Sequence, residues 1–127
     1  MLPFLKRKRR VLLLDDDPSM QRLVSALLQR EGYRVETFLT GRDAMRAMDA
    51  KEYDVLLLDL MMPHEGGMTV IRHLRAQQPD LLHRVLVLTG SPQAIIGKVK
   101  NEVAGVVKKP FEAPELIGAV RRISKPR

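Results

Sequence analysis

The stretch Val11-Leu12-Leu13-Leu14-Asp15-Asp16-Asp17-Pro18 decides the fold of this chain of 127 residues. Its four consecutive apolar residues predict a strand over residues 10–15 that is buried on both faces, because half-exposed strands alternate apolar and polar side chains. Asp17 followed by Pro18 is typical of a helix start, and Gly32 is placed to end that helix. Between them, apolar residues at helical spacing predict one buried face: Met20, Leu23, Val24, Leu27 and Leu28.

The same unit of strand, polar turn and amphipathic helix recurs along the chain. Four further strands are predicted, over residues 33–39, 53–60, 84–89 and 105–108. Further helices are predicted after Thr40, through Val70, weakly over 92–103, and from Pro114. The weak segment would bury one face made of Ile95, Val99 and Val103. Because continuous apolar strands need cover on both faces, we predict an α/β fold: a doubly wound five-stranded parallel sheet with five helices.

The net charge of +7 belongs to the two ends of the chain. Residues 6–10 carry five basic side chains and residues 121–127 carry four, with no acid in either segment, and the rest has 13 basic residues against 15 acidic ones. Such ends can contact phosphate or a membrane surface, but solvated tails are the simpler interpretation. Aromatic residues make up 4% of the chain and no nucleic-acid motif is present, so we expect no direct nucleic-acid binding and no membrane partner.

Cysteine is absent, which excludes disulfides, thiolate metal sites and a cysteine nucleophile. No apolar run is long enough to cross a bilayer, and residues 1–10 make a poor secretory signal, so we expect a cytoplasmic location. The length fits one domain. We expect that domain over residues 10–123, preceded by a basic extension at 1–9 and followed by a short tail at 124–127.

Reactive side chains follow four of the predicted strands at the point where each strand ends. Asp15-Asp16-Asp17 follow the first, Asp59 the third, Thr89 the fourth and Lys109 the fifth. In open parallel sheets the functional crevice lies beyond these carboxyl ends. Clustered carboxylates repel one another unless a cation neutralises them, and oxygen ligands of this kind suit Mg²⁺. An ionised Asp59 would be a nucleophile for phosphoryl transfer, with Lys109 and Thr89 stabilising the phosphoryl oxygens.

Each of these features has a plain structural explanation when it is taken alone. Asp17 is more readily a helix cap than a metal ligand. Thr89 can begin a turn with Gly90-Ser91-Pro92, and Lys109 can form a solvated pair with Lys108. The set is informative only because its members occur together and in this order.

Taken together, the motifs resemble the receiver domain of bacterial two-component response regulators, over residues 10–123. Leu14-Asp15-Asp16-Asp17-Pro18 is similar to the acidic start of that family, and Asp59-Leu60-Met61-Met62-Pro63 with Gly66-Gly67 is similar to its phosphoacceptor loop. Thr89-Gly90 and Lys109-Pro110-Phe111 resemble its hydroxyl and lysine motifs. The resemblance implies the flavodoxin-like receiver fold with strand order 2-1-3-4-5.

The resemblance also implies a Mg²⁺ site and the residues that form it. Asp16 and Asp59 would ligate the ion directly, together with the main-chain carbonyl of Met61. Asp15 would act through bound water. Mg²⁺ is the only cofactor implied.

By the same resemblance, Asp59 is the phosphorylation site, and Thr89 and Lys109 contact the phosphoryl group. A sensor histidine kinase or a phosphotransfer protein would be the donor, and a downstream protein or a missing output domain would receive the signal. The domain would catalyse its own phosphorylation and dephosphorylation without being a conventional enzyme. We expect dephosphorylation to be slow, because neither Met61 nor Ser91 can strongly orient an attacking water. A homodimer is compatible with the family.

One position departs from the family pattern. Receivers usually carry an aromatic residue in the fifth strand that swings inward when the threonine engages phosphate, and the matching residue here is Val106. The usual switch is therefore in doubt, although phosphorylation is not. The alternative functions are a non-phosphorylated pseudo-receiver that serves as an interaction module, and an aspartate-nucleophile phosphohydrolase. The second alternative is disfavoured because such enzymes usually carry an acid two residues after the nucleophile, where this chain has Met61.

Overall fold

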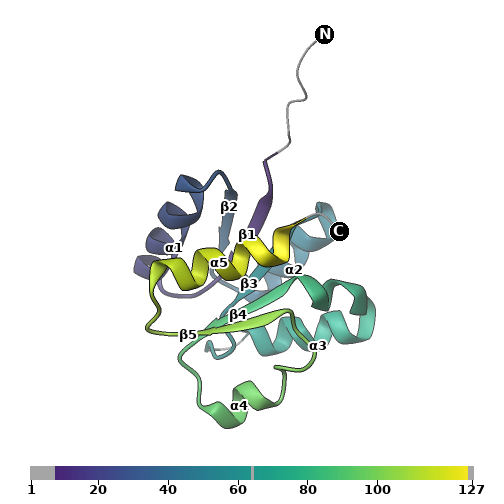
Figure 1. Cartoon of the computed structure of the whole chain (residues 1–127). Helices are drawn as coiled ribbons and strands as arrows, with labels where there is room; N and C mark the ends of the chain where they lie inside the picture. Colours follow the sequence, from purple (N-terminus) through teal and green to yellow (C-terminus); the bar gives the residue numbers. More distant parts are fainter. Residues whose placement is uncertain (1–7, 64, 126–127) are drawn as a thin grey trace.

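The computed structural model describes residues 8–63 and 65–125, which form one five-stranded parallel sheet with helices on both faces (Figure 1). The strand order is β2-β1-β3-β4-β5, with all four neighbouring pairs parallel, as predicted. The strands are β1 (Arg10–Leu14), β2 (Arg34–Phe38), β3 (Val55–Leu58), β4 (Val85–Thr89) and β5 (Gly105–Lys108). β2 is the exposed edge strand, whereas every residue of β3 and β4 is buried.

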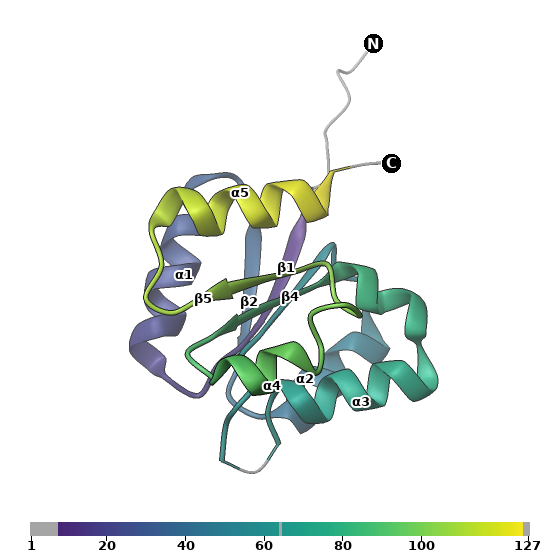
Figure 2. The same ribbon diagram turned by 60° about the horizontal axis from the view of Figure 1, so that its bottom comes forward.

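The helices divide between the two faces of the sheet. They are α1 (Pro18–Arg30), α2 (Gly41–Ala50), α3 (Gly67–Gln77), α4 (Gln93–Gly97) and α5 (Ala113–Ser124), with a 3₁₀ helix η1 (Pro79–Arg84) before β4. The helices α1 and α5 cover one face, and α2, α3 and α4 cover the other (Figure 2). The order of strands and helices makes this a doubly wound α/β fold.

The apolar run at the start of the chain explains why both faces must be covered. Alternate residues of β1 point to opposite sides, so Leu12 and Leu14 join the core beneath α2 and α3, whereas Val11 and Leu13 join the core beneath α1 and α5. All four side chains are at most 1% exposed. Truncation of any of these leucines to alanine would cost about 2–5 kcal/mol.

Helix α1 begins and ends where its sequence predicts. The Asp17 carboxylate accepts a hydrogen bond from the backbone N–H of Ser19 (2.9 Å), and Pro18 occupies the first turn. Gly32 adopts φ of 94°, a left-handed conformation that favours glycine, and directs the chain into β2.

The structure corrects the details of two predicted segments. Leu23 is 48% exposed, because the buried stripe of α1 is centred on Val24 and Leu28. The helix predicted over 92–103 ends at Gly97, and it buries Ile96 in place of Ile95. Turns follow it, in which Val99 is buried and Val103 is only half-buried.

The last helix overlaps the expected C-terminal tail by one residue. Ser124 is the buried last residue of α5, so the helix includes the first residue of the expected tail. Residues 1–7 of the expected basic extension and residues 126–127 of the tail lie outside the described residues. Among the helices in the described part of the chain, none is long and apolar enough to cross a membrane.

Candidate active site

The candidate site lies at the carboxyl edge of the sheet, where four adjacent strands deliver the predicted side chains. Asp15 and Asp16 follow β1, Asp59 follows β3, Thr89 ends β4 and Lys109 follows β5. The strands β1, β3, β4 and β5 are consecutive neighbours, so segments far apart in sequence meet at one place. The structure therefore brings together all five side chains that the sequence singled out.

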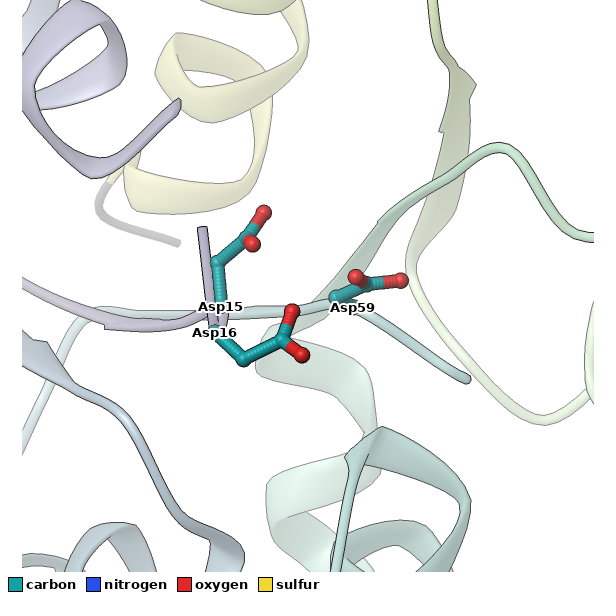
Figure 3. Close-up of side chains that lie close together, drawn as sticks. All are labelled: Asp15, Asp16 and Asp59. Carbon is teal, nitrogen blue, oxygen red and sulfur yellow. The ribbon is translucent and has the colours of Figure 1, made fainter. Parts of the chain in front are cut away.

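Three carboxylates from the ends of β1 and β3 form an acidic cluster (Figure 3). Asp15, Asp16 and Asp59 each offer an oxygen, and these oxygens lie within 4.8 Å of one another. Oxygens on opposite sides of an octahedral Mg²⁺ lie about 4.2 Å apart, so this donor set fits a small hard cation after minor adjustment. Asp16 is exposed and Asp59 is 9% exposed, which leaves the cluster open to water on one side.

Asp15 is held in place by several hydrogen bonds. Its carboxylate accepts bonds from the backbone N–H of Asp17 (2.9 Å) and from Lys109 Nζ (2.7 Å), and it is 1% exposed. The side-chain amide of Gln21 in α1 donates to the carbonyls of Asp15 (2.8 Å) and Phe38 (3.0 Å). Gln21 thus fixes the backbone at the ends of β1 and β2, the point from which the acidic residues project.

Asp59 is a largely buried carboxylate with several donors directed at it. Thr89 Oγ1 donates to its Oδ1 (3.0 Å), and the backbone N–H of Met61 also donates to its carboxyl group. Burial and the nearby charge of Asp15 raise the pKa of Asp59 and outweigh the lowering effects of Lys109, Thr89 and Met61. Without a cation, the ionised form of Asp59 is therefore disfavoured relative to an exposed aspartate.

Lys109 is the one cation among the five side chains of the site. Its Nζ lies 2.7 Å from Oδ2 of Asp15 and 3.6 Å from Oδ2 of Asp59. Burial alone would lower the pKa of Lys109, but the hydrogen bond with Asp15 and the charges of Asp59 and Asp15 raise it. Lys109 is thus firmly protonated, and an anionic group next to Asp59 would meet its positive charge.

The loop after β3 passes close to Asp59 because it contains a glycine. The N–H of Gly67 donates to the carbonyl of Asp59 (2.6 Å), and a Cβ at position 67 would fall on that carbonyl oxygen. Only glycine allows this approach, which starts α3 directly behind the site. Met61 in the same loop is 55% exposed, and its side chain contributes no polar group to the site.

Val106 lies in β5 opposite Val87 and packs against the core beneath α3 and α4. It is half-buried, and its branched side chain fills space next to β4. The position is therefore occupied by a small apolar residue that cannot swing as an aromatic ring would.

The sequence did not predict the hydrogen bonds that two further side chains make at the site, although it placed Ser91 beside it. One is Gln21, described above. The other is Ser91, whose Oγ lies 2.7 Å from Thr89 Oγ1 and whose N–H donates to the same oxygen (3.1 Å). Because the Thr89 proton is directed at Asp59, Ser91 Oγ is the donor to Thr89. A polar residue two positions after the strand-end threonine was the available signal.

Comparison with known protein families matches residues 11–121 to the model of the response regulator receiver domain. Among characterised proteins, the chain is 34% identical over 123 residues to the transcriptional regulatory protein TcrA of Mycobacterium tuberculosis, covering 91% of this chain and 46% of that protein. It is 32% identical over 114 residues to the DNA-binding response regulator MtrA of Mycolicibacterium smegmatis, covering 90% and 50%. The chain thus spans about half the length of these relatives.

Solved structures give the same result for the fold. The response regulator TrrA of Thermotoga maritima, in complex with Mg²⁺ and BeF, superposes with a TM-score of 0.80 at 28% identity, covering 91% of this chain and 98% of that one. The chemotaxis protein CheY4 of Vibrio cholerae superposes with a TM-score of 0.82 at 29% identity, covering 92% and 99%.

Proposed function

The chain belongs to the family of response regulator receiver domains of two-component systems, and on this premise we propose that Asp59 accepts a phosphoryl group in a Mg²⁺-dependent reaction. The observation that carries the proposal is the position of the Asp59 carboxylate. It lies close to the carboxylates of Asp15 and Asp16, and the Thr89 hydroxyl (3.0 Å) and Lys109 Nζ (3.6 Å) are directed at it. We assign the receiver domain to residues 10–123.

The reaction forms a bond between a carboxylate oxygen of Asp59 and phosphorus. With a phosphohistidine donor, the P–N bond breaks, and the leaving imidazole nitrogen keeps the bonding pair and takes a proton from solvent. Lys109 and the hydroxyl of Thr89 stabilise the negative charge on the transferred oxygens. Asp59 must be ionised to attack, and a bound cation would favour that form against the burial that raises the pKa of this group in the metal-free protein.

The residues that would hold Mg²⁺ are Asp16, Asp59 and the main-chain carbonyl of Met61, with Asp15 acting through water. Mg²⁺, when bound, offsets the charge of the carboxylates and of the incoming phosphoryl group. Asp15 accepts hydrogen bonds from Lys109 and from the backbone, so its carboxylate is already engaged and suits the indirect role. The complex of the Thermotoga relative with Mg²⁺ and BeF supports a Mg²⁺ site in this chain.

The partners follow from this chemistry. The donor is a sensor histidine kinase or a phosphotransfer protein, which places the reaction in the cytoplasm. The signal passes to a downstream protein or to an output domain like the remaining half of the DNA-binding relatives. A pseudo-receiver is disfavoured, because a degenerate site would have lost at least one of its acidic, hydroxyl or lysine groups.

Two residues shape how the signal differs from that of a typical receiver. Val106 excludes the aromatic swing, so the phosphorylated state must be read through another movement of the α4–β5 face. Slow loss of the phosphoryl group follows from Met61, because a thioether side chain next to Asp59 cannot orient a water molecule. If substitution of Met61 by asparagine left the decay rate unchanged, this reasoning would be wrong.

The test is the intact-protein mass after incubation with acetyl phosphate, with and without Mg²⁺. We expect a single phosphoryl adduct that requires Mg²⁺ and is absent from Asp59→Asn. The matched control is Asp54→Asn, which removes an aspartate from the other end of β3 and should leave the adduct intact. Absence of an adduct on the folded wild-type protein in the presence of Mg²⁺ would favour the interaction-module function.

A further inference from the structure

The amino ends of the strands form a second charged surface, opposite the acidic site. We call it the basic pole, and it consists of Arg9, Arg10, Arg34, Arg84, Arg122 and Lys125. Arg10 and Arg34 are register partners at the starts of β1 and β2, and the N–H of Arg34 donates to the carbonyl of Arg9 (2.9 Å). The start of β1 and the end of α5 lie side by side (Figures 1 and 2), which brings Arg9 and Lys125 to one place.

A hollow of about 590 Å³ opens at the centre of the basic pole. Arg9, Arg84 and Lys125 line it, together with His83, Asp54 and Asp80. Asp54 is already engaged, because its carboxylate accepts a hydrogen bond from the backbone N–H of Arg10 (2.7 Å) and lies 3.8 Å from Arg9. The hollow therefore has three cationic side chains, Arg9, Arg84 and Lys125, with Asp80 as its second carboxylate, around a space that can admit a phosphate headgroup.

Most of the cations at this pole make no salt bridge in the described residues 8–63 and 65–125, although the charge of Arg10 acts on Glu36. The Arg9–Asp54 contact is the single ion pair of the pole there, and Arg84 uses one guanidinium nitrogen to donate to the carbonyl of Tyr53 (2.8 Å). Helix dipoles account for basic residues in the last turn of α5, such as Arg122. They do not account for arginines that precede or begin strands, such as Arg10 and Arg34, so the charge density of the pole is unexplained by the fold.

From these observations we infer that the basic pole binds the surface of a membrane rich in anionic phospholipids. Clusters of four to eight basic residues at a membrane surface attract anionic headgroups, and each such residue adds to the attraction. The sequence that leads into the pole strengthens this choice, because Met1, Leu2, Phe4 and Leu5 supply apolar side chains directly before Lys6, Arg7 and Lys8. Apolar side chains next to basic ones add buried apolar area to the electrostatic attraction to anionic lipids.

A membrane is favoured over nucleic acid by the chemistry of the same residues. Nucleic-acid recognition combines a basic groove with aromatic side chains for stacking or with side chains that read base edges. The six residues of the basic pole are arginine or lysine, and the hollow is lined at its apolar side by Ile123. The sequence alone favoured solvated ends, because it does not show that residues 9 and 125 line one hollow.

Binding in this orientation keeps the acidic site accessible. β1 runs from Arg10 in the basic pole to Asp15 in the site, and a five-residue strand spans about 16 Å. An anionic surface attracts the basic pole and repels the acidic edge, so Asp59 faces away from the bilayer toward a phosphodonor. The inference does not depend on phosphorylation of Asp59, and it can be tested on the unphosphorylated chain.

The experiment is co-sedimentation of the full chain with vesicles made of equal parts phosphatidylglycerol and phosphatidylcholine, beside vesicles of phosphatidylcholine alone. We expect binding only to the anionic vesicles, and a loss of binding at high salt. Arg122→Glu/Lys125→Glu should weaken binding at least about tenfold. Leu2→Ser/Phe4→Ser should also weaken it, and the matched control Arg42→Glu/Arg46→Glu on α2 should bind much more tightly than the Arg122/Lys125 variant.

Circular dichroism of each variant establishes that it is folded before its binding is compared. Binding to a random duplex DNA without binding to anionic vesicles would overturn the inference, as would binding to neither. An equal loss of vesicle binding in the α2 control would also overturn the inference, because binding would then depend on the net charge of the chain and not on the position of the basic residues. If only the variant at Leu2 and Phe4 lost binding, the basic pole would have no part in it.

Discussion

Asp54 and Asp59 bracket the same buried strand, β3, and their surroundings differ sharply. Asp54 precedes the strand, and its carboxylate is satisfied by the backbone N–H of Arg10 and lies near the guanidinium of Arg9. Asp59 follows the strand, is 9% exposed, and shares its surroundings with two other carboxylates and one lysine. Asp54 thus stabilises the fold at the amino edge of the sheet. Asp59, at the carboxyl edge, belongs to a group in which three carboxylates share one lysine.

This difference shows how the direction of a parallel strand assigns roles to residues of the same type. At the amino edge some polar groups have close partners, such as Asp54 with the backbone N–H of Arg10, Arg84 with the carbonyl of Tyr53, and the uncharged pair Tyr33 and Ser124. The carboxyl edge gathers three carboxylates around Lys109, which lowers stability and prepares the site for a cation. Removal of a carboxylate charge should therefore have opposite effects on stability at the two edges, and removal of a cation should cost more at the carboxyl edge.

The largest expected effect is the loss of the cation at the carboxyl edge. Lys109→Met leaves the buried carboxylates of Asp15 and Asp59 without a positive partner and should lower the free energy of unfolding by about 2 kcal/mol in the absence of Mg²⁺. Arg84→Met at the amino edge removes one hydrogen bond to a carbonyl and should cost about 1 kcal/mol. Urea denaturation of both variants measures the difference. An equal loss would mean that the two edges do not differ in charge balance.

The second prediction compares the two aspartates of β3 by isosteric substitution. Asp59→Asn removes a buried charge from the cluster and should raise the free energy of unfolding of the metal-free protein by about 1 kcal/mol. Asp54→Asn weakens a hydrogen bond from a backbone N–H and should lower it by about 0.5 kcal/mol. Added Mg²⁺ should stabilise the wild type more than Asp59→Asn. Destabilisation by both substitutions would contradict the comparison.

The third prediction concerns a satisfied carboxylate near the amino edge, where the Tyr53 hydroxyl donates to Glu36 (2.6 Å). Burial alone would raise the pKa of Glu36, but hydrogen bonds from Tyr53 and Lys51 outweigh it and hold the pKa below its usual range. The stability that this bond contributes is present above the ordinary pKa of Glu36 and is lost as the pH falls through its lower folded value. Tyr53→Phe should therefore lower the free energy of unfolding by about 1 kcal/mol at neutral pH, and by progressively less below about pH 4.

Thermal denaturation of wild type and Tyr53→Phe across this pH range checks the third prediction. The control is Tyr33→Phe, whose lost hydrogen bond to Ser124 joins two uncharged groups and should cost the same amount at every pH. A cost for Tyr53→Phe that stayed constant in acid would show that Glu36 does not supply the charge.

The smallest expected effect lies away from both edges. Arg75 in α3 makes a bidentate ion pair with Glu102 (2.6 and 2.7 Å), but both side chains are substantially exposed. Arg75→Ala should leave global stability nearly unchanged, because exposed pairs are screened by water. Amide exchange of residues 101–104 should become faster, since the pair joins this turn to α3. A large change in global stability would place Arg75 among the structural residues of the fold.

The sequence predicted the sheet well and its details less well. Val55–Leu58 and Val85–Thr89 were recognisable as strands because each contains a continuous apolar run. The strand predicted over 53–60 was too long, because Tyr53 and Leu60 are buried although they lie outside β3. Leu23 was wrongly predicted to be buried. It lies at the edge of the apolar stripe of α1, and the sequence does not show how much of that stripe the sheet covers. The end of α4 at Gly97 was not predicted, because the sequence does not show that the core buries Ile96 in the helix and Val99 in the turns that follow it.

The site was predictable to the extent that strand direction determines it. Residues that directly follow strands, such as Asp59 and Lys109, could be placed together before the structure was known. Gln21 and Ser91 act through hydrogen bonds to a backbone carbonyl or to a neighbouring hydroxyl, and such bonds leave no periodic pattern in the sequence. The basic pole was missed because its two halves are separated by more than a hundred residues.

The most direct test of the central claim is to locate the phosphoryl group after reaction with acetyl phosphate and Mg²⁺. Borohydride reduces an aspartyl phosphate to homoserine, and peptide mass spectrometry then identifies the modified position. The account predicts homoserine at position 59 and aspartate at positions 15, 16 and 54. Homoserine at any of those other positions, or its absence from position 59 in a protein that carries the adduct, would contradict the assignment of Asp59 as the phosphoacceptor.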